Sequence, residues 1–229
     1  GHISMWDVSR VTNMSGLFSK DIPFNENINS WDVSNVKTMM AMFANAESFN
    51  QPLDQWDVSR VEDMKCMFIR AKSFNQDINC WNVARVYRSD HMFTNAWMYN
   101  SPMDRWDVSN VVDMGEMFLH ATSFNQPLNT WNVGQVRNMK NMFYEAESFN
   151  QPLDQWDVSH VERMIFTFYK AVEFNQDINS WNVSNVVNMS HMFNGASKYN
   201  SPMDRWNVSN VIDMDGMFDN AKAFNQPLI

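Results

Sequence analysis

The chain has 229 residues, of which 45% are hydrophobic and 14% aromatic, enough apolar material for a packed core, so intrinsic disorder is excluded. Its formal net charge of −9 and its pI near 4.9 argue against a basic surface for nucleic acid and against electrostatic docking on anionic lipid. No apolar run is long enough to cross a bilayer, so we expect no membrane insertion by this segment.

A period of 25 residues runs through the whole chain. Trp, Phe and Asn each recur at this interval without insertion or deletion, and the unit reads W-[DN]-V-S-x-V-x-[DN]-M-x-x-M-F-x-x-A-x-S-F-N-Q-[PD]-[LI]-[DN]-x. A fixed period of this length is typical of stacked repeat proteins, in which each unit buries its apolar face against its neighbours. We therefore predict a single repeat domain over residues 1–229, made of nine units and excised from a longer array.

The segment that follows Trp in each unit predicts a short helix. Met39, Met42, Phe43 and Ala46 have the i, i+3, i+4, i+7 spacing of an amphipathic helix. Just ahead of this stripe most units carry a polar side chain suited to cap the first amides of a helix: Asn13, Thr38, Asp63, Asp113, Asn138, Asn188 and Asp213.

The end of each unit and the Trp that opens the next predict a short strand. Leu53, Trp56 and Val58 match the L-x-x-L-x-L spacing of a leucine-rich repeat. Stacking would pair such strands in a parallel sheet. The predicted fold class is therefore α/β, an LRR-like right-handed solenoid in which each of nine repeats has a short parallel strand and a short helix.

One Asn falls at the same place in every unit, between the predicted helix and strand. A side-chain amide at this turn is suited to bond the backbone of the next coil, so we favour a structural ladder over a row of ligand-binding amides. Its members are Asn25, Asn50, Asn75, Asn100, Asn125, Asn150, Asn175, Asn200 and Asn225.

The run W-D-V-S-N-V-x-x-M-x-x-M-F-x-x-A-x-x-F-N-Q-x-[LI] resembles the 25-residue repeat of BspA-like leucine-rich-repeat surface proteins, the group that includes mycoplasma-type surface lipoproteins. The resemblance covers essentially the whole chain, with departures such as Ser89 for Met and Thr167 for the second Met. It implies an extracellular or surface-displayed array used in adhesion or partner binding. It supplies no binding residues, because the residues that the family shares are those of its core.

Two acidic columns also repeat every 25 residues, one starting at Asn29 and one at Asp7, and both mix Asp with Asn. Like charges stacked at strand spacing repel one another, and neutral Asn relieves that repulsion while it keeps the same hydrogen-bonding shape. We favour turn capping for these columns, with a calcium rail as the alternative.

No recognised catalytic motif is present, and His residues occur without metal-ligand spacing. Cys66 and Cys80 also lack such spacing; two unpaired thiols are favoured over a bridge. We therefore predict that the protein is not an enzyme, with no catalytic residue, no metal and no cofactor.

The residue after the repeated Phe points away from the apolar stripe, and this outward column is apolar or aromatic only in the middle of the array. Further apolar residues occur nearby in the fourth and seventh units. An apolar cluster on a mainly polar scaffold favours a partner site, with burial of these side chains in the fold or against a second copy as the alternative. The candidate partner-binding residues are Leu119, Tyr144, Ile165, Phe166, Tyr169, Tyr87 and Trp97.

Together these features predict a non-enzymatic, surface-displayed scaffold for adhesion or protein-partner binding. The expected partner is a protein or glycan on a host or neighbouring surface, not a nucleic acid. The expected location is extracellular or on a cell surface, with a virion surface as a second setting. The alternative is a structural fibre or coat element that associates head to tail with itself and has no separate ligand.

Overall fold

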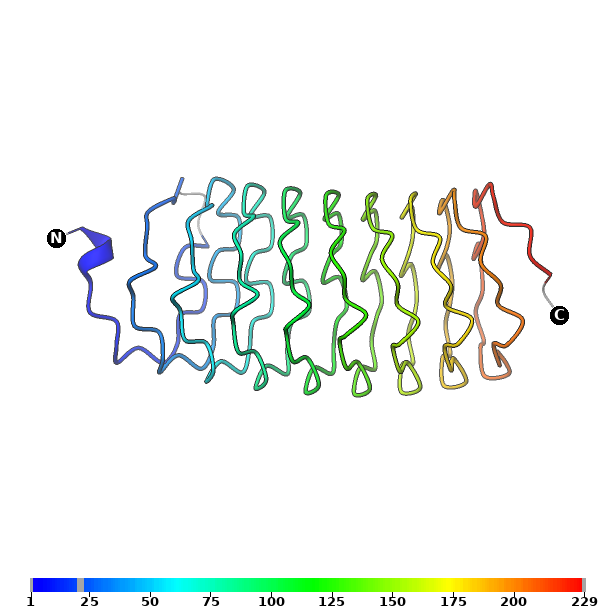
Figure 1. Cartoon of the computed structure of the whole chain (residues 1–229), viewed down its shortest axis with the longest axis horizontal. Coiled ribbons are helices and arrows are strands. Elements are labelled where there is room, and N and C mark those ends of the chain that lie inside the picture. The colour runs from blue at the N-terminus through cyan, green and yellow to red at the C-terminus, as the bar shows by residue number, and fades with distance from the viewer. Residues whose placement is uncertain (1, 20–22, 228–229) are drawn as a thin grey trace.

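The computed structural model describes residues 2–19 and 23–227. In Figure 1 the chain winds into coils that lie side by side along the long axis of the molecule, with the N- and C-termini at opposite ends. Parallel β-bridges join successive coils at positions 25 residues apart, so one coil corresponds to one sequence repeat. The bridged residues are, in order, Asn13, Thr38, Asp63, Arg88, Asp113, Asn138, Arg163, Asn188 and Asp213.

Regular secondary structure is nearly absent from the described part of the chain. It contains one short 3-10 helix, η1 (Ile3–Met5), the isolated bridges and a series of turns, and it contains no α-helix. Within these residues, therefore, no helix is long and apolar enough to cross a membrane.

The segment that predicted a helix forms overlapping turns, so the helix prediction was wrong. In the second coil the N–H groups of Met42 and Ala46 donate to the carbonyl groups three residues earlier, at 3.1 and 3.0 Å. Ala41 and Asn45 have left-handed φ angles of 54° and 61°, which no α-helix contains.

Stacking explains why turns replace the helix. The N–H groups of Met39, Ala41, Phe43 and Asn45 donate to carbonyl oxygens of the next coil at 2.8–2.9 Å. A helix would use these groups internally, whereas here every second one joins neighbouring coils. The turns still bury the apolar stripe, because Met39, Met42, Phe43 and Ala46 are all fully buried.

The strand prediction was also misplaced. Leu53, Trp56 and Val58 are buried, but the nearest parallel bridge lies later in the coil, at Asp63. The ladder between coils thus runs along the half of the unit assigned to a helix. The predicted caps sit on this ladder: Asn13 Oδ1, for example, accepts the N–H of Ser15 at 2.8 Å, in a turn rather than at a helix end.

Aromatic rings fill the interior of the stack. Within one coil the Phe43 and Phe49 ring centroids lie 4.1 Å apart, and between coils Phe43 and Phe68 are 5.4 Å apart and nearly parallel. The Trp56 and Trp81 rings stack at 6.3 Å. One contiguous core of buried side chains extends along the array, so each coil is held mainly by the coils on either side.

Each buried Trp also makes a polar contact between coils that the sequence pattern did not indicate. The indole N–H of Trp131 donates to the carbonyl oxygen of Met103 at 2.8 Å, and that of Trp156 donates to Leu128 at 2.9 Å. The interaction recurs from Trp31 to Trp206. Neither Phe nor Leu could supply this donor, which gives a physical reason for Trp at this place in the repeat.

Ser89 lines a small internal void of about 10 Å³. Every other unit has Met at the position of Ser89. Met64, Met92 and Met117 are among the lining residues of the void, and the Ser89 hydroxyl donates only to the sulfur of Met117 at 3.9 Å. The shorter side chain leaves the core underfilled at this coil.

We expect Ser89→Met to stabilise the protein by about 1 kcal/mol, because the longer side chain fills the void, and to raise Tm by roughly 2–4 °C. Differential scanning calorimetry measures both quantities. The reverse change, Met64→Ser, is the matched control and is expected to cost about 2–5 kcal/mol. An unchanged or lower Tm for Ser89→Met would show that the site is already well packed.

Candidate functional site

The Asn that recurs between the turns and Trp joins neighbouring coils. The side-chain oxygen of Asn125 accepts the backbone N–H of Asn150 at 2.9 Å and the amide of Gln151 at 3.1 Å. Equivalent contacts link successive Asn residues from Asn25 to Asn225. All of these side-chain oxygens but that of Asn225 are therefore engaged within the array rather than offered to a ligand.

The first acidic column forms pairs of Asn and Asp in adjacent coils. The Asn129 amide donates to the Asp154 carboxylate at 2.9 Å, and its oxygen accepts the backbone N–H of Gln155 at 3.0 Å. Hydrogen bonds from the side chains of Gln155 and, to a lesser extent, Asn129 lower the pKa of Asp154. The alternation of Asp and Asn thus places a donor opposite each paired carboxylate.

The second acidic column makes local turns. Asp57, for example, accepts the backbone N–H of Ser59 at 3.0 Å, and Asn132 does the same for Gly134 at 3.1 Å. Hydrogen bonds from the hydroxyl and the N–H of the following Ser lower the pKa of Asp57, and likewise of Asp107 and Asp157.

These lowered pKa values predict acid sensitivity. A carboxyl group whose pKa is lower in the folded state stabilises the fold above its unfolded pKa of about 3.9, and this stabilisation is lost as the pH falls through the folded pKa. We expect the triple change of Asp57, Asp107 and Asp157 to Asn to leave stability at neutral pH nearly unchanged. It should also reduce the loss of stability between about pH 5 and pH 3. Urea unfolding at each pH tests this, and an equal acid loss in both proteins would contradict it.

Among the residues that the structure describes, no group of three or more His, Cys, Asp or Glu side chains is placed to hold a metal ion. Four histidines, His2, His91, His120 and His191, lie instead beside carboxylates of adjacent coils, as in His91 with Glu116 at 3.0 Å. The acidic columns, in the part of the chain that is described, are thus arranged as hydrogen-bonded turns and ladders.

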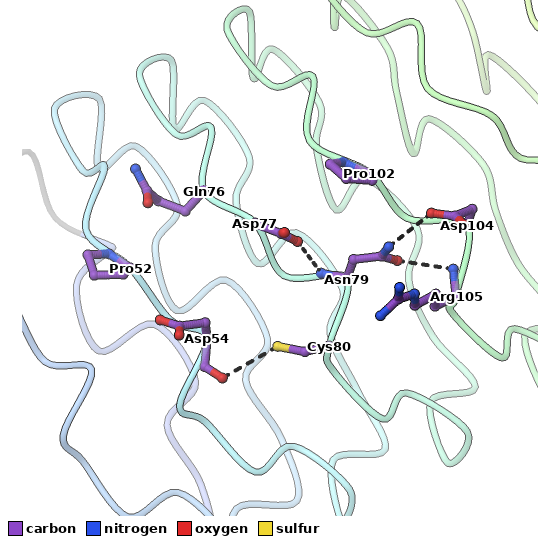
Figure 2. A pocket seen from close by; sticks show the side chains of 9 residues that line it. All are labelled: Pro52, Asp54, Gln76, Asp77, Asn79, Cys80, Pro102, Asp104 and Arg105. Carbon is purple, nitrogen blue, oxygen red and sulfur yellow. Dashed lines mark hydrogen bonds between the residues drawn. The ribbon is translucent and has the colours of Figure 1, made fainter.

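A shallow cleft of about 580 Å³ opens over the second to fourth coils, and Figure 2 shows the residues that line it. Its wall is already hydrogen-bonded, since the Asn79 amide donates to Asp104 at 2.9 Å and its oxygen accepts the N–H of Arg105 at 3.0 Å. The Cys80 thiol donates to the carbonyl oxygen of Asp54 at 3.4 Å, as the hydroxyl of Ser180 does to Asp154. Cys80 therefore occupies a structural position.

Both cysteines are free. Burial raises the pKa of the Cys66 thiol and of the Cys80 thiol, so neither is activated as a thiolate at neutral pH.

Five side chains in the middle of the array form a half-buried aromatic surface, here called the aromatic face: His120, Tyr144, Phe166, Tyr169 and His191. Tyr144 and Tyr169 stack at 4.4 Å, and His120 stacks on Tyr144 at 5.4 Å. Phe166 meets Tyr169 edge to face at 5.4 Å and stacks on His191 at 4.7 Å. These residues come from four successive coils and lie on the turn ladder.

Three residues of the aromatic face have left-handed backbone φ angles, which favour glycine. His120, Phe166 and His191 have φ angles of 57°, 55° and 54°, a region that costs a residue with a Cβ about 1–2 kcal/mol. The position of Phe166 and His191 holds glycine in other units, for example Gly216. Large side chains are thus displayed at turn positions that the backbone alone would give to glycine.

The other residues that the sequence predicted as partner-binding are not part of the aromatic face. Leu119 and Ile165 are half-buried on the same ladder. Tyr87 and Trp97 are 47% and 45% exposed on an earlier coil, where the Lys72 ammonium lies 4.8 Å from the centroid of the Trp97 ring. His120 and His191 were not among the candidates, because only their contacts with rings one coil away show that they belong to the surface.

The chain is matched over its whole length by a family model described as "Mycoplasma protein of unknown function, DUF285", over residues 1–104, 76–171 and 152–229. A comparison with curated proteins finds no match. Among solved structures, a TLR13–ssRNA13 complex is similar to 86% of the chain with a TM-score of 0.33 and 6% identity, and the match spans 35% of the TLR13 chain.

An internalin (inlF) from Listeria monocytogenes is similar to 87% of the chain with a TM-score of 0.29 and 9% identity, over 78% of its own length. The TM-scores of both structures are low. The three family matches, in contrast, overlap and together cover every residue of the chain. The protein therefore belongs to the DUF285 family of Mycoplasma-type repeat proteins.

Proposed function

We propose that the protein is a non-enzymatic repeat scaffold, displayed on a cell surface, that binds a partner protein through the aromatic face. The observation that carries this proposal is the contact between Tyr144, Phe166 and Tyr169 at the surface of a rigid stack. Clustered aromatic side chains of this kind are the residues that most often dominate binding energy in protein interfaces.

The remaining side chains of the array support a scaffold. The Asn and Trp contacts join coil to coil, and the polar columns bond to backbone or to one another. These interactions hold the turn ladder in register, which pre-organises the aromatic face for binding. The resemblance to BspA-like surface proteins supports adhesion and an extracellular or cell-surface location, with a virion surface as a second setting.

Replacement of Tyr144 and Tyr169 by Ser tests the proposal. The probe is binding of the fluorescently labelled chain to fixed epithelial cells, measured before and after the cells are treated with trypsin. We expect the double change to weaken binding at least tenfold, because two interface anchors are lost, with an unchanged circular dichroism spectrum. Trypsin treatment should abolish binding of the unaltered chain.

Asn194→Ser is the matched control, since Asn194 occupies the same place in the coil after Tyr169, and it should bind normally. Binding that survives the double change, or that survives trypsin, would contradict the proposal. Sedimentation of the chain over a concentration series tests the alternative: reversible growth into fibres by all variants, together with no binding to cells, would favour a self-associating coat element.

A further inference from the structure

One pair of residues in the eighth coil has the sequence at which an asparagine side chain is chemically least stable. Gly195 is the only glycine of the chain that follows an asparagine, Asn194. Asn is thermolabile because the backbone nitrogen of the next residue can attack its side-chain carbonyl carbon. A glycine in that place has no Cβ to hinder the attack. Asn194 and Gly195 therefore form a candidate modification site.

The fold requires glycine at the second residue of this pair. Gly195 has a φ of 72°, in the left-handed region, and a Cβ there would lie 2.8 Å from Cγ of Lys170 in the seventh coil. The reactive sequence therefore cannot be removed at Gly195 without strain in the stack.

The turn ladder holds the atom that would attack. The N–H of Gly195 donates to the carbonyl oxygen of Asp219 in the ninth coil at 2.7 Å. Attack on Asn194 requires the Gly195 nitrogen to lose its proton, and this hydrogen bond retains that proton. The reaction therefore needs the contact between the eighth and ninth coils to open.

The ninth coil packs less densely than the eighth. Phe193 is fully buried, whereas Phe218, at the same place in the ninth coil, is half-buried and lies 5.9 Å from Phe193. Ile212, also in the ninth coil, is 87% exposed. A segment with few buried apolar contacts opens at a lower free energy than the whole molecule unfolds. Local opening of the ninth coil thus frees the Gly195 nitrogen while the rest of the array stays folded.

We propose that Asn194 is a deamidation site whose rate is set by opening of the ninth coil. In the open state solvent base removes the amide proton of Gly195, and the nitrogen forms a bond to Cγ of Asn194. The Cγ–Nδ2 bond breaks, and the side-chain nitrogen takes a proton from water and leaves as ammonia, so that a cyclic imide remains. Water then opens the imide at Cγ to give aspartate, or at the backbone carbonyl carbon to give isoaspartate.

The products change both the aromatic face and the ladder. The Asn194 amide nitrogen lies 3.2 Å from Nδ1 of His191, and conversion replaces this amide by a carboxylate. Isoaspartate also adds one methylene to the main chain between two ladder bonds, the one that Asn194 accepts from Lys170 and the one that Gly195 donates to Asp219. Both bonds cannot then keep their register, so the ninth coil separates more readily.

Peptide mapping by mass spectrometry, during incubation of the whole chain at mildly alkaline pH, follows the conversion of Asn194. A synthetic peptide of residues 189–200, which has no neighbouring coil, gives the unprotected rate. We expect conversion in the folded chain to be at least tenfold slower than in the peptide. Phe218→Ala, which loosens the ninth coil, should speed conversion in the folded chain about fivefold to thirtyfold, because the open state becomes more populated.

Trp131→Phe is the matched control, because it removes an indole contact from the sixth coil and leaves the eighth and ninth coils intact. It should change the conversion rate less than about twofold. Conversion as fast in the folded chain as in the peptide, or an unchanged rate in Phe218→Ala, would overturn the proposal. So would equal acceleration by both variants, since that would identify unfolding of the whole array as the step that exposes Asn194.

Hydrogen exchange tests the effect of the product on the ladder. The isoaspartate form, separated by anion exchange, should exchange faster than the unconverted chain over residues 213–220. Equal exchange in the two forms would contradict the loss of register.

Discussion

Phe143→Ala is expected to destabilise the protein by about 3–5 kcal/mol, the usual cost of removing a buried Phe side chain from a packed core. Phe143 is fully buried, and its ring lies 4.1 Å from Phe149 in its own coil. It also stacks on Phe118 at 5.6 Å and on Phe168 at 5.5 Å, in the coils on either side. The truncation therefore leaves a cavity between three coils, and chemical denaturation measures its cost.

Phe218→Ala is the matched control for this prediction. Phe218 holds the same place in its coil but is only half-buried, with ring neighbours Phe193 at 5.9 Å and Phe224 at 4.1 Å. It should cost about 1–2 kcal/mol, because less apolar surface returns to water. Hydrogen exchange should show that Phe143→Ala loosens mainly the coils near it, as expected of a one-dimensional array. Equal costs at the two positions would show that contacts between coils contribute little.

Trp131→Phe is expected to cost about 2 kcal/mol, from one lost hydrogen bond and a smaller ring. The Trp131 indole N–H donates to the Met103 carbonyl oxygen at 2.8 Å, and the side chain is 2% exposed. Phe retains an aromatic ring in the stack, but it has no donor. Thermal unfolding followed by calorimetry measures the loss.

Trp6→Phe is the corresponding control. Trp6 is 54% exposed, so the same chemical change should alter stability by less than about 0.5 kcal/mol. A cost at Trp131 no larger than that at Trp6 would show that the indole contact between coils contributes nothing to stability.

The sequence predicted only some of the residues of the aromatic face. Tyr144 and Tyr169 stand one period apart, so the repeat alone predicts that they occupy neighbouring coils at the same place. Phe166 was found because it is a large apolar residue at a position that holds small or polar residues in the other units. His120 and His191 were not found, because an isolated histidine in a sequence gives no sign that a ring in the next coil lies against it.

The sequence by itself determined the 25-residue coil, the residues that fill the core and the partition of each unit into buried and outward positions. These follow from side-chain polarity and spacing, which hold whatever the backbone does, as Met39, Met42, Phe43 and Ala46 illustrate. An apolar stripe at this spacing is compatible both with a helix and with a run of turns.

Only the tertiary structure decided between a helix and a run of turns. A backbone N–H such as that of Ala41 can bond within its own coil or to the carbonyl oxygen of Lys65, and the second acceptor exists only once another coil lies beside the first. Stacking supplies that acceptor at alternate residues, and the left-handed φ of Ala41 and Asn45 turns the chain so that these bonds form. Phe166 and His191 occupy the position of Ala41 in their coils, and His120 occupies that of Asn45, so all three have the same left-handed φ. This backbone geometry places their rings in the aromatic face.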